Sequence, residues 1–342
     1  MVKTKLALIG LGYWGPNYAR IISESDNIEL SYCCDISRSS MEKIHKRYPY
    51  IKTSSNYKDI LKDSELKGII VVTPPATHYQ IVKDCLSAGK DVLVEKPITL
   101  NSKDADKLVD LAKNKKRILM VDHIFQFNPA VRKLKEIVSK KKLGKIFYIT
   151  GSYTALGPVR TDVNSLWDLA PHYFYILEYL IGKYPSWVSV FGESYLAKGR
   201  EDIIFINLQF PVKISVNIQV SWLYPYKVRN LVLVGSKRMA VFDDIHSDEK
   251  IRIYNKGASY DKNDPDYPNI LRVTYREGDL IIPRITPSEP LVEVLHTFVD
   301  SIYSRILKES DGMSGRNTIK ILEAAQKSLE QGGKVVNISY ES

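Results

Sequence analysis

Lys96 and His172 are the residues whose neighbours in the sequence point most directly to chemistry. Lys96 follows Glu95 after the apolar run VLV, so the end of a buried strand would deliver a carboxylate and an ammonium to one place. His172 lies four positions after Asp168, and residues at that spacing share one face of a helix. A partly desolvated lysine exchanges its proton closer to neutral pH, and a histidine beside an aspartate is a suitable proton acceptor. Both groups therefore predict acid–base chemistry, although the spacing of Glu95 and Lys96 alone slightly favours a surface charge pair at a strand end.

The stretch ALIGLGYWGPNYA predicts a dinucleotide-binding loop. Gly10, Gly12 and Gly15 have the spacing G-x-G-x-x-G between a strand-like run and a helical pattern, and Asp35 follows the next strand. The first glycine permits a tight turn, the second lets the backbone approach a pyrophosphate, and the third allows close helix–strand packing. Asp35 would accept hydrogen bonds from ribose hydroxyls and repel a 2′-phosphate. This favours NAD over NADP, although the Arg38 guanidinium would accommodate that phosphate.

These residues must be positioned by the elements around them. In the first third of the chain, apolar runs of β character alternate with helical periodicity, which predicts a parallel, doubly wound Rossmann sheet with right-handed crossovers. The expected strands are 5–10, 28–35, 68–73, 91–96 and 117–122, and the expected helices are 17–25, 39–48, 78–89 and 102–115. Ligands bind beyond the carboxyl ends of such strands, so Thr73, Pro74, His78, Glu95 and Lys96 are expected to gather over the cofactor.

The pattern changes near residue 122, which predicts a Rossmann domain over 1–122 and a second domain over 123–342. The second domain is expected to be α+β, with a large open and predominantly antiparallel sheet, because polar and apolar residues alternate in its strand-like runs. The expected strands are 145–153, 202–210, 213–222 and 229–243, the expected helices are 128–144, 165–182, 291–306 and 317–332, and 255–290 is expected to be irregular loop.

Composition limits the classes of function. The 342 residues include 49 basic and 39 acidic side chains, and the net charge of +10 comes from scattered lysines rather than from a nucleic-acid-binding module. No apolar run approaches the roughly 20 residues of a membrane span. Three cysteines without metal spacing favour the cytoplasm. A metal site formed by His123, Asp168 and His172 lacks a compact ligand motif, so no metal is expected.

The stretches GLGYWG, VVTPPATH and EKP occur in this order, and DHIFQFNPAVRKLKEIV and LGPVRTDVNSLWDLAPHYFYILEYLIG follow them. Over residues 4–240 the sequence resembles the glucose–fructose oxidoreductase / inositol dehydrogenase (Gfo/Idh/MocA) family. The resemblance implies that Lys96 is a catalytic-site residue, that Glu95 contacts the nicotinamide ribose and that the peptide between Lys96 and Pro97 is cis. It also implies that Asp168 and His172, the family's D-x-x-x-H signature, belong to the catalytic site.

Two features of the D-x-x-x-H region leave another interpretation open. Pro171 is typical of a first helical turn, in which case Asp168 is only an N-cap and His172 a core residue. Tyr173 stands where close relatives often have an aspartate, and the polar contact made by that aspartate is then missing.

The remaining candidates lie on loops or at the ends of elements. Tyr13 and Trp14 belong to the glycine loop. Trp14 and Trp167 pack either beside the nicotinamide or as core or rim residues. His123 either faces the substrate or bridges the two domains. Arg160 and Asn164 precede the helix that carries Asp168, and they either hold a substrate phosphate or carboxylate or cap the structure.

The expected activity is reversible hydride transfer between a sugar or polyol carbinol and NAD. The stretches GYWGPN and LWDLAPH resemble members that oxidise nucleotide-linked sugars at C3, such as UDP-N-acetylglucosamine or its uronic acid. A dehydrogenase of a free polyol such as myo-inositol, and a non-catalytic dinucleotide-binding regulator, are the alternatives.

The resemblance also implies a homodimer or homotetramer through the second-domain sheet, with a small-molecule substrate as the other partner. The residues predicted to bind the cofactor are Gly10, Gly12, Tyr13, Trp14, Gly15, Asp35, Arg38, Thr73, Pro74, His78, Glu95 and Lys96, and those predicted to bind the substrate are Lys96, His123, Arg160, Asn164, Asp168 and His172.

Overall fold

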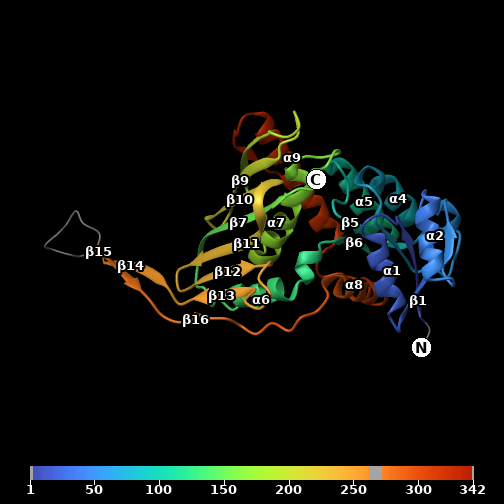
Figure 1. Cartoon of the computed structure of the whole chain (residues 1–342), viewed down its shortest axis with the longest axis horizontal. Helices are drawn as coiled ribbons and strands as arrows, with labels where there is room; N and C mark the ends of the chain where they lie inside the picture. The colour runs from blue at the N-terminus through green and yellow to red at the C-terminus, as the bar shows by residue number, and fades with distance from the viewer. Residues whose placement is uncertain (1–2, 262–271, 341–342) are drawn as a thin grey trace. The chain divides into compact units, whose positions relative to one another are not determined.

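The computed structural model describes residues 3–261 and 272–340, which divide into two compact units (Figure 1). The first unit comprises residues 1–127, 288–320 and 340–342, and the second comprises residues 128–287 and 321–339. Each unit has its own β-sheet. Among the described residues, no helix combines the length and the hydrophobicity that crossing a bilayer requires.

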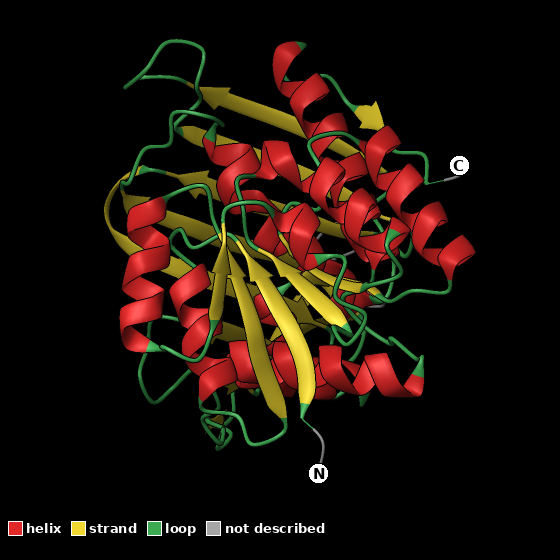
Figure 2. Ribbon diagram, turned by 90° about the vertical axis from the view of Figure 1, so that its right-hand side faces the viewer, coloured by secondary structure: helices red, strands yellow, loops and turns green. Residues whose placement is uncertain are grey.

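The sheet of the first unit has six parallel strands in the order β3-β2-β1-β4-β5-β6, and Figure 2 shows strands of this sheet running in one direction. This confirms the predicted doubly wound Rossmann architecture. Because the order reverses between β1 and β4, the carboxyl ends of these strands form the switch point at which such sheets bind ligands. The strands are β1 (Thr4–Ile9), β2 (Ile28–Cys34), β3 (Lys52–Ser54), β4 (Gly68–Val71), β5 (Asp91–Glu95) and β6 (Leu119–Asp122).

Helices cover this sheet, and three of them, α2, α3 and α5, begin at residues whose side chains cap the helix. The side chains of Ser37 and Asn101 accept hydrogen bonds from the backbone N–H of Ser40 and Asp104 at the starts of their helices. The helices are α1 (Gly15–Ser23), α2 (Arg38–Arg47), α3 (Tyr57–Ile60), α4 (Pro75–Ser87), α5 (Ser102–Lys115) and α8 (Pro290–Ser304), with a 3₁₀ turn at Ile124–Phe127. The chain thus returns to the first unit after residue 288, where Phe298 of α8 is fully buried in the core formed with β1 and β4.

The second unit has a nine-stranded sheet in the order β16-β13-β12-β11-β7-β10-β9-β8-β17. Only β7 and β10 pair in parallel, so the predicted large and predominantly antiparallel sheet is confirmed. Its strands are β7 (Ile146–Leu156), β8 (Trp187–Glu193), β9 (Ile203–Phe210), β10 (Ile214–Ser221), β11 (Leu223–Gly235), β12 (Met239–Asp243), β13 (Ile251–Tyr254), β16 (Leu280–Ile281) and β17 (Val336–Asn337). The helices are α6 (Pro129–Ser139), α7 (Ser165–Ile181) and α9 (Gly312–Glu330), of which α9 gives residues 312–320 to the first unit.

The structure differs from two expectations for the second unit. The run 229–243 is two strands, because a turn at residues 236–238 reverses the chain between β11 and β12. The segment 255–290 is not entirely loop, since β14 (Gly257–Asp261) and β15 (Arg272–Arg276) pair as a hairpin that extends from the sheet in Figure 1. Residues 262–271 of that segment lie outside the described part of the chain.

The packing of α8 predicts that Phe298→Ala strongly destabilises the first unit. A Cβ added to Gly68 of β4 would lie 2.9 Å from the Phe298 ring, so the ring fills the space above the strand. Removing a buried phenyl ring costs about 3–5 kcal/mol. Urea denaturation should show this loss, whereas Phe147→Ala, at an aromatic residue exposed on the second unit, should cost less than about 1 kcal/mol. Equal effects of the two substitutions would contradict this account of α8.

Candidate active site

The glycine loop between β1 and α1 is shaped by close backbone packing. Gly10 has a φ of +102°, and a Cβ there would lie 2.7 Å from the carbonyl oxygen of Val72. A Cβ on Gly15 would lie 2.3 Å from the carbonyl oxygen of Gly10. A Cβ on Gly12 would meet nothing within 4 Å. The first and third glycines are therefore required by the fold, while the second leaves open space above the loop.

Asp35 is fixed beside this loop at the end of β2. One carboxylate oxygen accepts a hydrogen bond from the backbone N–H of Leu11 at 2.6 Å, and the other accepts one from the N–H of Ser37 at 2.7 Å. The start of α1 has no side-chain cap. Pro16 carries no N–H and the N–H of Asn17 donates to the Trp14 carbonyl at 2.9 Å, so the Gly15 N–H is the first-turn donor that remains for a ligand or for water. Open space at Gly12, this N–H group and the Asp35 carboxylate fit a dinucleotide with a pyrophosphate and a ribose.

The other predicted residues around the loop have different environments. Arg38 has an 89% exposed side chain that pairs with Glu42 on its own helix. Tyr13 is exposed, and its ring meets that of Trp14 edge-on at 5.4 Å. Trp14 is half-buried and packs against the core of the first unit.

His78 connects the two strand ends that carry the other cofactor candidates. It is buried, and its ring nitrogens each lie 2.8 Å from a carbonyl oxygen, that of Thr73 and that of Pro97. Burial lowers the pKa of His78, while the two carbonyls favour its protonated form. With both nitrogens used inside the protein, His78 holds the segment after β4 against the segment after β5. The peptide between Lys96 and Pro97 is cis.

Asp122, which the sequence analysis did not select, lies beside the end of β5. Strand register pairs it with Glu95, and its carboxylate accepts a 2.5 Å hydrogen bond from the Tyr18 hydroxyl. Its side chain is 1% exposed and its second oxygen is buried with no hydrogen-bond partner among the described residues. Burial raises its pKa to about 6, against the opposing effects of the Tyr18 hydrogen bond and the Lys96 charge. Asp122 is therefore a buried carboxylate that interacts electrostatically with Lys96.

His123 follows Asp122 but is enclosed in the first unit. Its Nδ1 lies 3.4 Å from the Ser314 hydroxyl, and burial lowers its pKa to about 3. The ring is therefore neutral at physiological pH. Its surroundings within this unit are those of a core histidine.

The helix that carries Asp168 and His172 begins at an asparagine cap. Asn164 accepts a hydrogen bond from the backbone N–H of Trp167 at 3.2 Å, and its own amide donates to Glu201 and Gln326. Pro171 consequently lies inside α7. The interpretation of Asp168 as the N-cap is wrong, because the N-cap of α7 is Asn164, four residues earlier. The alternative role of Asn164, capping the structure, is the one that its contacts show.

Asp168 is held by two donors from other elements. Its carboxylate accepts a hydrogen bond from the Trp222 indole N–H at 3.1 Å and from the Arg160 guanidinium at 3.5 Å. Arg160 is also bound to Asp162, and the two carboxylates together raise the pKa of its guanidinium. These contacts fix the Asp168 carboxylate at the start of α7, with a permanently charged guanidinium beside it.

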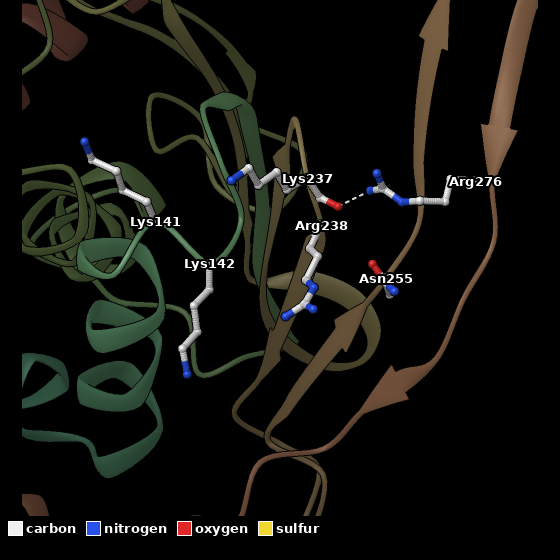
Figure 3. Close-up of a pocket in the computed structure, with 6 residues that line it drawn as sticks. All are labelled: Lys141, Lys142, Lys237, Arg238, Asn255 and Arg276. Atoms are coloured by element: carbon white, nitrogen blue, oxygen red, sulfur yellow. Dashed lines mark hydrogen bonds between the residues drawn. The ribbon is translucent and has the colours of Figure 1, made fainter.

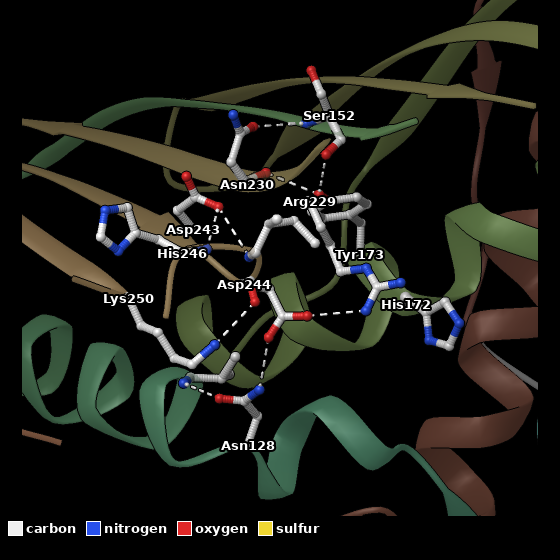
Figure 4. Close-up of polar contacts among 12 residues, drawn as sticks. Asn128, Ser152, His172, Tyr173, Arg229, Asn230, Asp243, Asp244, His246 and Lys250 are labelled. Atoms are coloured by element: carbon white, nitrogen blue, oxygen red, sulfur yellow. Dashed lines mark hydrogen bonds and ion pairs between the residues drawn. The ribbon is translucent and has the colours of Figure 1, made fainter. Parts of the chain in front are cut away.

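His172 is supported by aromatic side chains of the same unit. Its Nδ1 lies 2.5 Å from the Tyr175 hydroxyl, and its ring centroid lies 5.5 Å from that of Tyr153. The Arg229 guanidinium carbon lies 4.3 Å from the centre of the Tyr153 ring, and Arg229 pairs with Asp244 at 2.9 Å (Figure 4). In the tautomer whose Nδ1–H donates to Tyr175, Nε2 carries the lone pair that a general base requires.

Tyr173 has a structural environment that explains the missing aspartate. Its hydroxyl lies 2.7 Å from the carbonyl oxygen of Ser152 and 2.9 Å from that of Asn230, on the two paired strands β7 and β11 (Figure 4). The side chain is buried, and burial raises its pKa well above the ordinary value. Tyr173 therefore fastens α7 to the sheet and does not replace the polar contact of an aspartate.

A metal centre has no support in the described part of the chain, where no three His, Cys, Asp or Glu side chains gather as ligands. The contacts above instead define two groups. The first unit contributes the glycine loop, Asp35 and Lys96, and the second contributes Asp168 and His172 with Arg160.

Comparisons with known proteins agree with this description. A family profile described as "Oxidoreductase family, NAD-binding Rossmann fold" (GFO_IDH_MocA) matches residues 4–123, and the GFO/IDH/MocA C-terminal domain profile matches residues 131–241. An uncharacterized oxidoreductase from Streptococcus pneumoniae is 24% identical over 68% of this chain and 66% of its own length. The myo-inositol 2-dehydrogenase of Thermotoga maritima is 24% identical over 96% of both chains.

Solved structures show the same fold. UDP-N-acetylglucosamine 3-dehydrogenase from Acidithiobacillus ferrooxidans is 21% identical, with a TM-score of 0.80 over 97% of this chain and 99% of that one. GenD2 from gentamicin A biosynthesis, solved in complex with NAD, is 19% identical, with a TM-score of 0.82 over 99% of this chain and 97% of that one.

The environment of Asp122 predicts a pH-dependent stability that Asp122→Asn removes. A carboxyl whose folded pKa of about 6 exceeds its unfolded value stabilises the fold at low pH, and this stabilisation is lost as the pH rises through 6. The free energy of unfolding of the wild type should therefore fall, relative to Asp122→Asn, between about pH 4 and pH 7. Urea denaturation at three pH values measures this. Tyr18→Phe removes the hydrogen bond that lowers the pKa of Asp122, so the fall in stability should extend to higher pH in this variant. A difference in unfolding free energy between the wild type and Asp122→Asn that does not change with pH would contradict the raised pKa of Asp122.

Proposed function

Because the chain belongs to the Gfo/Idh/MocA family of NAD-binding oxidoreductases, we propose that Lys96, Asp168 and His172 carry out its chemistry. The protein is an NAD-dependent dehydrogenase of sugar-type hydroxyl groups, with NAD as cofactor. Bound NAD supplies the hydride acceptor, and the residues that fit it are those of the glycine loop together with Asp35. The observation that carries the proposal is that a strand-end lysine and a supported histidine–aspartate helix occur in the same chain.

In the proposed reaction His172 is the general base. In the tautomer whose Nδ1–H donates to the Tyr175 hydroxyl, Nε2 accepts the proton of the substrate hydroxyl while the hydride leaves its carbon. The Lys96 ammonium donates a hydrogen bond to the developing oxyanion, and this stabilises the transition state more than the ground state. Asp168 orients the pair, and the reaction runs in reverse when the imidazolium returns its proton.

We propose a nucleotide-linked sugar, oxidised at C3, as the substrate. The stretches GYWGPN and LWDLAPH, and the full-length likeness to a UDP-N-acetylglucosamine 3-dehydrogenase, support this choice. Arg160 supports it too, because a partly exposed guanidinium beside Asp168 is suited to a phosphate. A free polyol is the second candidate, since the match to the myo-inositol 2-dehydrogenase spans 96% of both chains. A non-catalytic regulator would have no need for Lys96, Asp168 and His172 together.

The oligomeric state and the cellular location of the protein are also proposed. Phe191 and Phe205 lie opposite each other on neighbouring strands and are 56% and 39% exposed, which supports a homodimer or homotetramer through this face of the second-unit sheet. Three free, buried cysteines support a cytoplasmic location.

Absorbance of reduced nicotinamide separates these possibilities. The protein is incubated with NAD and, in turn, UDP-N-acetylglucosamine, its uronic acid, myo-inositol and scyllo-inositol. The proposal expects the highest kcat/KM with a UDP-sugar. A higher kcat/KM with an inositol would contradict the nucleotide-sugar substrate but not the dehydrogenase activity. If no sugar or polyol led to reduction of NAD, the result would favour a non-catalytic dinucleotide-binding regulator.

The role of Lys96 predicts that Lys96→Met abolishes turnover and keeps NAD binding. Methionine preserves the length of the side chain but removes the charge, so kcat should fall by about 10²–10⁴-fold while the Kd for NAD changes little. Steady-state kinetics and calorimetric NAD titration measure the two effects. Lys103→Met, at an exposed lysine of the same unit, is the matched control. Turnover of Lys96→Met at the level of this control would remove the lysine from the mechanism.

A further inference from the structure

A pocket in the second unit is surrounded by positive charge. Figure 3 shows the six residues that line this cavity of about 470 Å³. They come from three places: the loop after α6, the turn between β11 and β12, and the strands β13 and β15 with the residues beside them. This basic pocket consists of Lys141, Lys142, Lys237, Arg238, Asn255 and Arg276.

Specific backbone contacts bring the first two cationic segments together. The backbone N–H of Lys237 donates to the carbonyl of Leu143 at 2.9 Å, and that of Ser236 donates to the carbonyl of Lys145 at 2.8 Å. A Cβ on Gly235 would lie 2.2 Å from the Leu143 carbonyl oxygen, so only glycine permits this approach. The backbone therefore holds the loop after α6 against the turn between β11 and β12. The proximity of their cationic residues follows from this backbone packing and not from a particular side-chain conformation.

Strand β15 is attached to the turn between β11 and β12 by the side chain of Arg276. The Arg276 guanidinium donates a hydrogen bond to the backbone carbonyl of Lys237, as Figure 3 shows. In the same view Lys142 and Arg238 extend in one direction from neighbouring segments. Five N–H-bearing cations and the Asn255 amide thus surround one space.

No carboxylate within residues 3–261 and 272–340 compensates the charge of the basic pocket. Among the described residues, none of its five cations forms an ion pair with a carboxylate. The lysines of α6 and its C-cap differ from those of the basic pocket in this respect, because Lys133 and Lys140 both form ion pairs with Glu136. Like charges held close together repel each other, and a bound anion would relieve this repulsion.

The basic pocket is separate from the residues proposed for catalysis. It lies at the start of β7, which begins at Ile146, whereas Tyr153 beside His172 is seven residues further along the same strand. At 3.3 Å per residue this is a separation of roughly 23 Å within one unit. A ligand of the basic pocket therefore does not occupy the His172 site.

We propose that the basic pocket binds a small phosphate-bearing anion, either inorganic pyrophosphate or the diphosphate group of a nucleotide. Guanidinium forks match the geometry of phosphate oxygens, and the lysines add point charges around them. The cations converge on one concave space, whereas a nucleic-acid surface spreads its cations along the path of the phosphate backbone. A diphosphate is thus the ligand that the arrangement favours.

Calorimetric titration with inorganic pyrophosphate tests the proposal. NAD is present at saturation, because the glycine loop is itself predicted to hold a pyrophosphate. One pyrophosphate should bind per chain, with a Kd that rises with salt concentration. The double substitution Lys142→Ala and Arg238→Ala should weaken binding at least tenfold. The charge-preserving pair Lys142→Arg and Arg238→Lys should retain it, and so should the exposed-site control pair Lys183→Ala and Lys213→Ala.

The outcomes separate the possible ligands. Tighter binding of ADP than of pyrophosphate assigns the basic pocket to a nucleotide, and the reverse assigns it to the free anion. Absence of binding to the NAD-saturated wild type, or equal binding by the wild type and the alanine pair, would overturn the proposal. It would also be overturned if duplex DNA bound through Lys142 and Arg238 and pyrophosphate did not compete. Because the readout is binding, none of these results depends on the proposed dehydrogenase activity.

Discussion

The close approach of the Gly10 carbonyl to Gly15 is the constraint on which the glycine loop of the first unit depends. A side chain at position 15 would overlap this carbonyl, so α1 begins close against the end of β1 only because glycine is there. The same short turn places the N–H of Leu11 on the Asp35 carboxylate. Backbone groups thus shape the proposed dinucleotide site, and side chains hold the neighbouring strand ends in place, as His78 does between the carbonyls of Thr73 and Pro97.

The surroundings of His172 in the second unit depend instead on side chains. His172 contacts Tyr175 and Tyr153, and Arg229 continues the chain of contacts to Asp244. Asp244 in turn accepts a hydrogen bond from Asn128, which caps α6 (Figure 4). A histidine supported in this way loses little conformational freedom when a substrate binds, which favours reactions that require close alignment.

The sequence predicted what is local and missed what depends on distant contacts. The glycine spacing, the strand–helix alternation and the alternating strands of the second sheet are local patterns, and the family, the fold class and NAD as cofactor are confirmed. The start of α7 at Ser165 agrees with the expected helix over 165–182. Only the alternative with Asp168 as N-cap is wrong, because Pro171 is tolerated inside this helix, against the usual preference of proline. The role of Asp122 was missed because its partner Tyr18 is 104 positions away. Similarly, the periodicity of α8 indicates an amphipathic helix but cannot show which core receives Phe298.

The central claim is that Lys96 and His172 act on the same substrate in one chemical step. A double-mutant cycle on kcat/KM tests it, using Lys96→Met, His172→Ala and the combined variant with the best substrate found. Groups that act as a unit in one transition state are strongly non-additive, so the combined variant should be no more than a few-fold slower than the slower single variant. If the two losses multiply, the residues act independently and the proposed mechanism is contradicted.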